Sequence, residues 1–106
     1  LGLQNQVRRS FPTRALRYVA PDEMKRIPTR GIAQRIANGD TIIVDLRGLV
    51  HMDSHQNACR RDLKMMTDEV GVGVFALDQE DKLLMIPGTD VVVDISNHSL
   101  GINPLM

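Results

Sequence analysis

The 106-residue chain carries 13 basic and 13 acidic side chains, and its length fits one domain. No apolar run approaches the roughly 20 residues needed to cross a bilayer, and the single cysteine, Cys59, excludes an internal disulfide and suits a reducing cytoplasm. Residues 1–47 hold nine basic and four acidic residues, but the basic residues are scattered among few aromatic ones, so we favour a solvated surface over nucleic-acid binding.

The first part of the chain predicts a linker, a strand and a helix. Residues 1–14 repeat apolar side chains every four positions around two arginines, which indicates an N-terminal linker or the remnant of an amphipathic membrane segment. Residues 15–19 predict a strand that Pro21 stops. The apolar spacing over residues 32–37 predicts a helix, and Gly39 can end it by taking a positive φ.

A central strand is predicted at residues 41–46, Thr-Ile-Ile-Val-Asp-Leu, because this β-branched run is too short for a helix and is bounded by glycines. Ile42, Val44 and Leu46 would face one side of the sheet. Ile43 would face the other side, so both faces of this strand need a cover.

A second helix follows. Asp53 and Gln56 predict a capping box at its start, and Gly71 predicts its end. The side chains expected to face the core are spaced by three or four: His55, Cys59, Leu63, Met66 and Val70. On this stripe a His55–Cys59 pair is interpreted as packing rather than as a nucleophile with its base.

The last third of the chain predicts strands that are apolar on both faces. Residues 72–77 and 82–86 predict a hairpin, residues 91–95 a final strand, and residues 96–106 a tail. We therefore expect an α/β sandwich over residues 15–95, with a mixed sheet of about five strands and two helices on one face. The second face would stay apolar and uncovered, which indicates a homodimer or a bound partner unless a chain terminus folds over it. The candidate dimer residues are Met65, Val74, Val91 and Val93.

No catalytic motif is found: the chain has no nucleophile elbow, P-loop, dinucleotide-binding fingerprint or zinc-protease motif. A metal site would need His51, His55, His98 and Cys59 to converge, which their spacing disfavours. We therefore expect a binding module rather than an enzyme, without metal or cofactor.

The segment from residue 38 to residue 94 resembles the SepF family of cell-division proteins, in its archaeal form. The matching pieces are residues 38–46 (Asn-Gly-Asp-Thr-Ile-Ile-Val-Asp-Leu), Asp53-Ser54, Arg61-Asp62-Leu63, the hairpin, and residues 83–89 (Leu-Leu-Met-Ile-Pro-Gly-Thr). The match covers more than half of the chain, in the order and spacing of the family.

This resemblance implies a small dimeric α/β sandwich with a non-enzymatic role. In the family an N-terminal amphipathic helix binds lipid, and the core binds the C-terminal tail of the tubulin-like protein FtsZ. FtsZ is thereby tethered to the cytoplasmic face of the membrane at the division site. The resemblance assigns the tail-binding residues to the hairpin: Phe75, Leu77, Leu83 and Met85, with Lys82 as a partner for acidic residues of the tail.

A second resemblance belongs to another class. Residues 43–54 look like the signature of STAS domains, the anti-sigma antagonists, in which a serine at a helix start is phosphorylated. Ser54 is the matching residue, and a helix N-terminus suits a phosphate. STAS domains place a helix after the next strand, whereas two further strands are predicted here. The SepF-like interpretation therefore fits the element order better.

Overall fold

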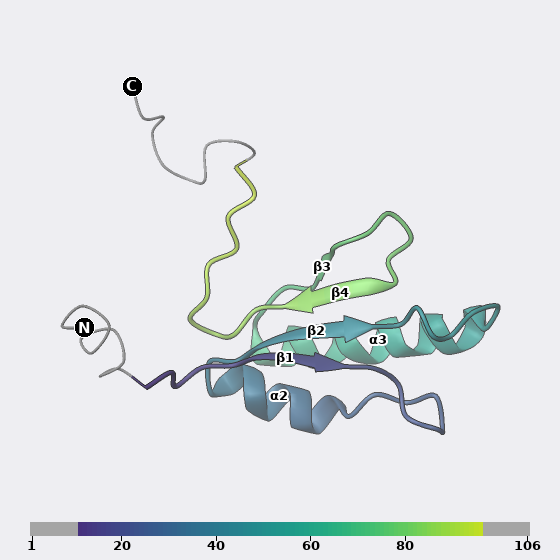
Figure 1. Cartoon of the computed structure of the whole chain (residues 1–106), viewed down its shortest axis with the longest axis horizontal. Coiled ribbons are helices and arrows are strands. Elements are labelled where there is room, and N and C mark those ends of the chain that lie inside the picture. Colours follow the sequence, from purple (N-terminus) through teal and green to yellow (C-terminus); the bar gives the residue numbers. More distant parts are fainter. Residues whose placement is uncertain (1–10, 97–106) are drawn as a thin grey trace, which may run out of the picture.

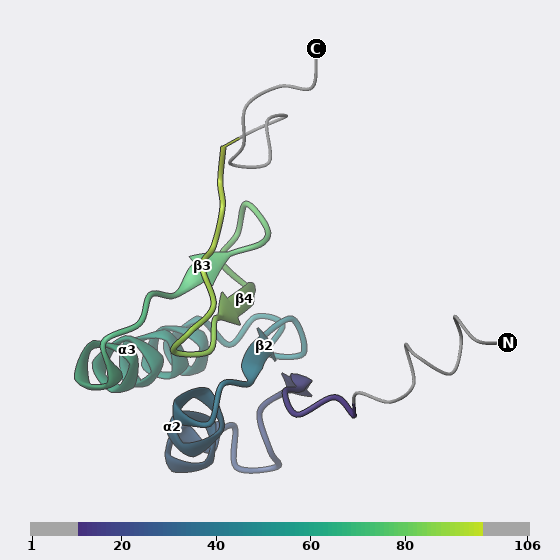
Figure 2. The same ribbon diagram turned by 90° about the vertical axis from the view of Figure 1, so that its left-hand side faces the viewer.

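The structure is a computed structural model that describes residues 11–96. Most of the predicted N-terminal linker and all but one residue of the predicted C-terminal tail lie outside the described residues. The elements in chain order are β1 (Leu16–Val19), α2 (Thr29–Ala37), β2 (Thr41–Asp45), α3 (Asp53–Val70), β3 (Phe75–Ala76) and β4 (Leu83–Ile86). Both helices lie on the same side of one sheet, which confirms the predicted two-layer arrangement (Figures 1 and 2).

The sheet has the strand order β1-β2-β4-β3. β1 and β2 are parallel, whereas β4 is antiparallel to both of its neighbours, so the sheet is mixed as predicted. β2 holds an inner position, and its residues Ile42 and Val44 are buried against the helices while Ile43 faces the opposite side.

The prediction of about five strands is wrong for the described residues, because four strands pair. Residues 91–96 adopt no strand, and β3 is shortened from the predicted 72–77 to Phe75–Ala76. β2 and β4 have a paired strand on each side, so a fifth strand could join only at the outer edge of β1 or of β3, and residues 91–96 reach neither edge. Val72 and Val74 instead pack against the core as a connection between α3 and β3.

Local chemistry explains where the helices end. Gly39 and Gly71 have φ angles of 101° and 88°, which confirms both predicted helix stops, since glycine adopts this conformation without steric cost. The predicted capping box at α3 is wrong: Met52 occupies the cap position and no side chain caps the helix. Gln56 is buried instead, and its Nε2 donates to the carbonyl oxygen of Leu49 at 2.5 Å.

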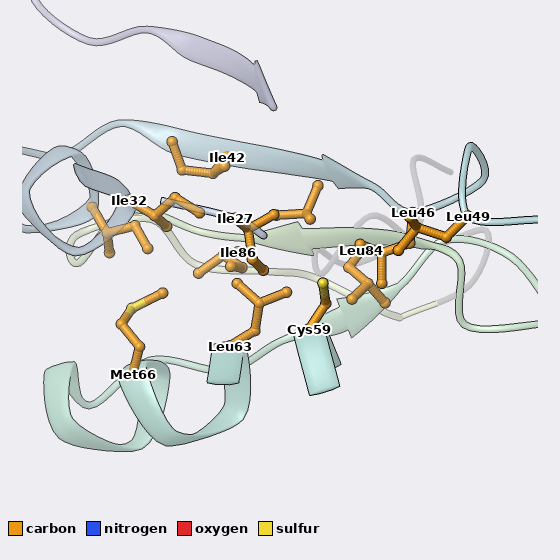
Figure 3. Close-up of a cluster of buried hydrophobic side chains, with 12 residues drawn as sticks. Ile27, Ile32, Ile42, Leu46, Leu49, Cys59, Leu63, Met66, Leu84 and Ile86 are labelled. Carbon is orange, nitrogen blue, oxygen red and sulfur yellow. The ribbon is translucent and has the colours of Figure 1, made fainter. Parts of the chain in front are cut away.

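The hydrophobic core fills the space between the helices and the sheet, as Figure 3 shows. Its fully enclosed members include Ile36 from α2, Leu63 from α3 and Ile86 from β4. Cys59, Leu63 and Met66 face this core as predicted, but His55 is exposed. The buried stripe of α3 also includes Gln56 and Thr67, so it differs from the predicted stripe at its ends and agrees with it in the middle.

A tight turn closes the sheet after β4. Gly88 is buried, and a β-carbon built on it would lie 2.4 Å from the carbonyl oxygen of Gly39. The N–H and hydroxyl of Thr89 both donate to the carbonyl oxygen of Ile36, at 3.2 and 3.3 Å. Asp90 forms an ion pair with Arg14. The chain therefore leaves the sheet from a fixed point.

Candidate functional site

The sheet surface away from the helices is the candidate site, and we call it the helix-free face. Strand register aligns Tyr18 with Ile43, Ile43 with Met85, and Met85 with Phe75. These four residues form one row across all four strands, aromatic at both ends and aliphatic in the middle. Alternation along each strand places the remaining members on the same side: Leu16, Thr41, Asp45, Leu77 and Leu83.

This face is apolar and open. Leu16 is 72% exposed, Tyr18 65% and Leu77 50%. The other apolar side chains of this face are half-buried: Ile43, Phe75, Leu83 and Met85. Isolated exposed apolar residues are normal, but a continuous apolar row across a sheet is typical of an interaction surface. The structure thus confirms that none of the helices in residues 11–96 covers this side, and residues 91–96 leave the end of the sheet without covering it (Figures 1 and 2).

Four of the five hairpin residues that the resemblance assigns to the FtsZ tail lie together, and Lys82 is the exception. Phe75, Leu77, Leu83 and Met85 share the helix-free face at its hairpin end. The Phe75 ring packs over Gly73, where an added β-carbon would meet the ring at 3.1 Å. Lys82 directly precedes β4, and its Nζ lies 2.8 Å from Glu80 Oε2.

One polar cluster interrupts the face at the carboxyl end of β2. Asp45 accepts hydrogen bonds from the Tyr18 hydroxyl at 2.6 Å and from Arg47 Nε and Nη2 at 2.9 Å each. The hydrogen bonds from Arg47 and Tyr18 hold the pKa of Asp45 well below its usual range. The bond to Asp45 raises the pKa of Tyr18. Tyr18 and Asp45 are 27 residues apart, so this contact could not be found from sequence periodicity.

The four candidate dimer residues do not lie on one surface. Met65 is 59% exposed on the outer side of α3, beside Arg30 of α2 in a groove between the helices. Val74 packs against the edge of the core. Val91 and Val93 lie beyond the end of the sheet, so a single contact patch would not include all four.

The described residues contain no group of three histidine, cysteine or acidic side chains that could hold a metal ion. Cys59 is buried with its Sγ 3.5 Å from the Lys25 carbonyl oxygen, and burial raises the pKa of its thiol. His51 and His55 are exposed, and His98 lies outside the described residues. Within residues 11–96 no helix is long and apolar enough to span a membrane.

Ser54, the residue that matched the STAS signature, is exposed in the first turn of α3. The elements after α3 are β3 and β4, joined as an antiparallel hairpin without a helix between them. The STAS-like order of a strand followed by a helix is therefore absent from this part of the described chain.

Comparison with protein-family models finds no match, and neither does comparison with curated protein sequences. Two solved structures are similar in fold. A SepF-like protein from Archaeoglobus fulgidus superposes with a TM-score of 0.61 at 16% identity, covering 77% of this chain and 94% of its own. A SepF-like protein from Pyrococcus furiosus superposes with a TM-score of 0.64 at 8% identity, covering 80% of this chain and 99% of its own. The chain therefore has the SepF-like fold, as the sequence resemblance implied.

Proposed function

We propose that this chain is a SepF-type cell-division adaptor. Its core binds the C-terminal tail of FtsZ and, as a homodimer, helps to hold FtsZ filaments at the cytoplasmic face of the membrane at the division site. The observation that carries the proposal is the apolar row across the helix-free face, on a fold shared with SepF-like proteins along nearly their whole length. The absence of catalytic motifs in the sequence agrees with a binding role.

The hairpin end of the face has the properties needed to bind a short peptide. Phe75 and Met85 lie side by side in the register, and Leu77 projects half-exposed beside Leu83. An incoming apolar side chain would remove these groups from water, at about 1.5–3 kcal/mol for each large residue fully buried. The face is open rather than enclosed, so an extended peptide can lie along it.

Lys82 is proposed to pair with acidic residues of the tail. Its present partner, Glu80, has a side chain that is 71% exposed. Exposed ion pairs contribute about 0–1 kcal/mol, so exchange of Glu80 for an acidic peptide residue costs little. Lys82 would then add specificity for an acidic tail more than it adds affinity.

Calorimetric titration with a synthetic FtsZ tail peptide tests the site. Phe75→Ala or Leu83→Ala should weaken binding by about tenfold or more, because each removes most of one large apolar contact. Met24→Ala is the matched control, since Met24 is 69% exposed but lies outside the face. Equal affinities for all three variants would reject the assigned residues, and no binding at hundreds of micromolar would reject the tail as partner.

The membrane tether is a separate part of the proposal. We expect residues 1–14, alone or with residues that precede them in the native protein, to bind an anionic lipid surface. Flotation with vesicles that contain anionic lipid should carry the protein with its native N-terminus upward, and removal of the segment through residue 14 should abolish this. Equal flotation of both proteins would reject the N-terminal segment as the anchor.

A further inference from the structure

Residues 91–95 have the chemistry of a strand but no strand partner. The sequence Val-Val-Val-Asp-Ile is rich in the β-branched residues that favour strands. Within the described chain these residues join no sheet, and Val92 and Ile95 are 89% and 76% exposed. Val93 is half-buried, and the Val91 N–H donates to the Gly88 carbonyl oxygen at 3.0 Å, but the rest of the segment has no strand to pair with.

The topology keeps this segment from joining its own sheet. β4 ends at the same end of the sheet at which the chain enters β1 and β3, because β4 is antiparallel to β2 and β3 while β1 is parallel to β2. The turn at Gly88–Asp90 fixes the exit between these two entering segments. To reach the outer edge of β1 or of β3, residues 91–95 would have to cross the segment that enters that strand. Connections at the same end of a sheet avoid such crossings.

A free edge of suitable length exists at β1. Ala15 directs its N–H to Asp40 at 2.8 Å and its carbonyl oxygen to the Thr41 N–H at 3.0 Å, both on the β2 side. Backbone groups alternate along a strand, so Leu16 and Tyr18 direct theirs toward the open edge. β1 has four residues, whereas β3 at the other edge has two. An exposed edge of this kind readily accepts another strand.

The two sides of this edge differ in charge. On the helix-free side lie the exposed apolar residues Leu16 and Tyr18. On the helix side a cavity of about 200 Å³ is flanked by Arg17 and Arg35. Arg17 is paired with Asp40 at 2.6 Å, whereas Arg35 forms no salt bridge with any of residues 11–96.

We propose that residues 91–95 of one copy add as a fifth strand to the free β1 edge of a second copy, in a reciprocal two-fold exchange. Three apolar residues, Val91, Val93 and Ile95, alternate with Val92 and Asp94. The apolar set extends the helix-free face of the second copy beside Leu16 and Tyr18. Asp94 then faces the helix side, where Arg35 provides an opposite charge. The exchange satisfies the backbone groups of both the segment and the edge.

This inference specifies how the homodimer of the proposed function forms, and it does not depend on FtsZ binding. The β1 edge is opposite to the hairpin, so the exchanged strand leaves Phe75 and Leu77 accessible. A chain truncated after Asp90 should therefore still bind the FtsZ tail peptide if the proposed function is correct. Loss of self-association with retained peptide binding would support both proposals separately.

Sedimentation velocity of the full chain and of the chain truncated after Asp90 tests the exchange. We expect a dimer at micromolar concentration for the full chain, and about a hundredfold or greater increase in the dimer dissociation constant after truncation, since several large apolar side chains lose their cover. Circular dichroism should show that the truncated chain keeps its fold. A monomeric full chain, or equal dimerisation of both chains, would overturn the proposal.

Proline substitution distinguishes strand pairing from general apolar contact. In an added edge strand, alternate N–H groups bond to β1 and the others point to solvent, so proline is tolerated at every second position. Val92→Pro and Val93→Pro should therefore differ by at least about tenfold in dimer dissociation constant, after comparison with Val92→Ala and Val93→Ala. Equal effects of the two prolines would exclude strand pairing.

Cross-linking between copies identifies the edge. A Val93→Cys chain is mixed with a Leu16→Cys chain and treated with a short bis-maleimide, while Leu77→Cys serves as the control at the opposite edge. Cys59 is buried and does not compete. Preferential cross-linking to the Leu16→Cys chain supports the β1 edge, and equal or greater cross-linking to the Leu77→Cys chain would overturn that assignment.

Discussion

The turn at Gly88 allows a sharp stability prediction, because the space for a side chain there is occupied by backbone. A β-carbon at Gly88 would lie 2.4 Å from the Gly39 carbonyl oxygen, 2.6 Å from the Gly39 carbonyl carbon and 3.0 Å from the Asp40 carbonyl oxygen. These atoms belong to the turn between α2 and β2 and cannot rotate away as a side chain can. Gly88→Ala must therefore displace the turn between α2 and β2 from the end of β4.

The expected cost of Gly88→Ala is about 2–4 kcal/mol, at or above the usual range for overpacking a close contact. For a domain of this size that corresponds to a melting temperature lower by roughly 10–25 °C. Gly48→Ala is the matched control: no atom lies within 4 Å of its added β-carbon, and its φ is outside the region reserved for glycine. The control should remain within about 1 kcal/mol of the parent chain, with stabilisation as the expected direction.

Urea unfolding followed by far-ultraviolet circular dichroism measures both variants, since the chain has no tryptophan for fluorescence. The midpoint of Gly88→Ala should fall clearly below that of Gly48→Ala at an unchanged denaturant slope. Coincident midpoints would show that the turn yields easily. The fixed exit of residues 91–95 from the sheet would then lose its support.

Four further predictions concern groups that the fold encloses or pairs. Asp45 keeps its charge in the folded chain to lower pH than when unfolded, so the free energy of unfolding should decrease as the pH is lowered through about 4. Asp45→Asn should flatten this decrease in urea midpoints measured between neutral and acidic pH. Loss of the Asp45 bond should also lower the pKa of Tyr18, the only tyrosine, in an ultraviolet titration; an unchanged value would exclude the hydrogen bond in solution. Cys59 should react with a thiol reagent only as fast as the chain opens, so rapid reaction in native buffer would contradict its burial. Leu63→Ala should cost about 2–5 kcal/mol in urea unfolding, since Leu63 is fully enclosed, and a loss under 1 kcal/mol would mean the core readily collapses around the gap.

The apolar face that is central to both proposals was predictable from local pattern. Alternation at residues 41–45 and 83–86 fixes which side chains share a face, whatever the strand order. The two helices were equally predictable, because an apolar stripe and a glycine stop act within a few residues. The start of the buried stripe of α3 was not predictable in this way: His55 and Gln56 differ by one position, and the buried Gln56 side chain donates a hydrogen bond to the carbonyl oxygen of Leu49, seven residues earlier.

Pairing between distant residues was decided by the tertiary structure. The sequence predicts strands at 72–77 and 91–95 from composition, yet a strand forms only where a neighbour offers free backbone groups. The order β1-β2-β4-β3 gives both inner strands their partners and directs residues 91–95 out between two entering segments. The hydrogen bond from Tyr18 to Asp45 is likewise long-range.

What the sequence determined by itself was the two helices, the inner strand and an apolar surface without a helix over it, because these follow from periodicity along the chain. The number of strands, the polar cluster at Asp45 and the position of each free edge came only from the tertiary structure, because they depend on which distant segments meet.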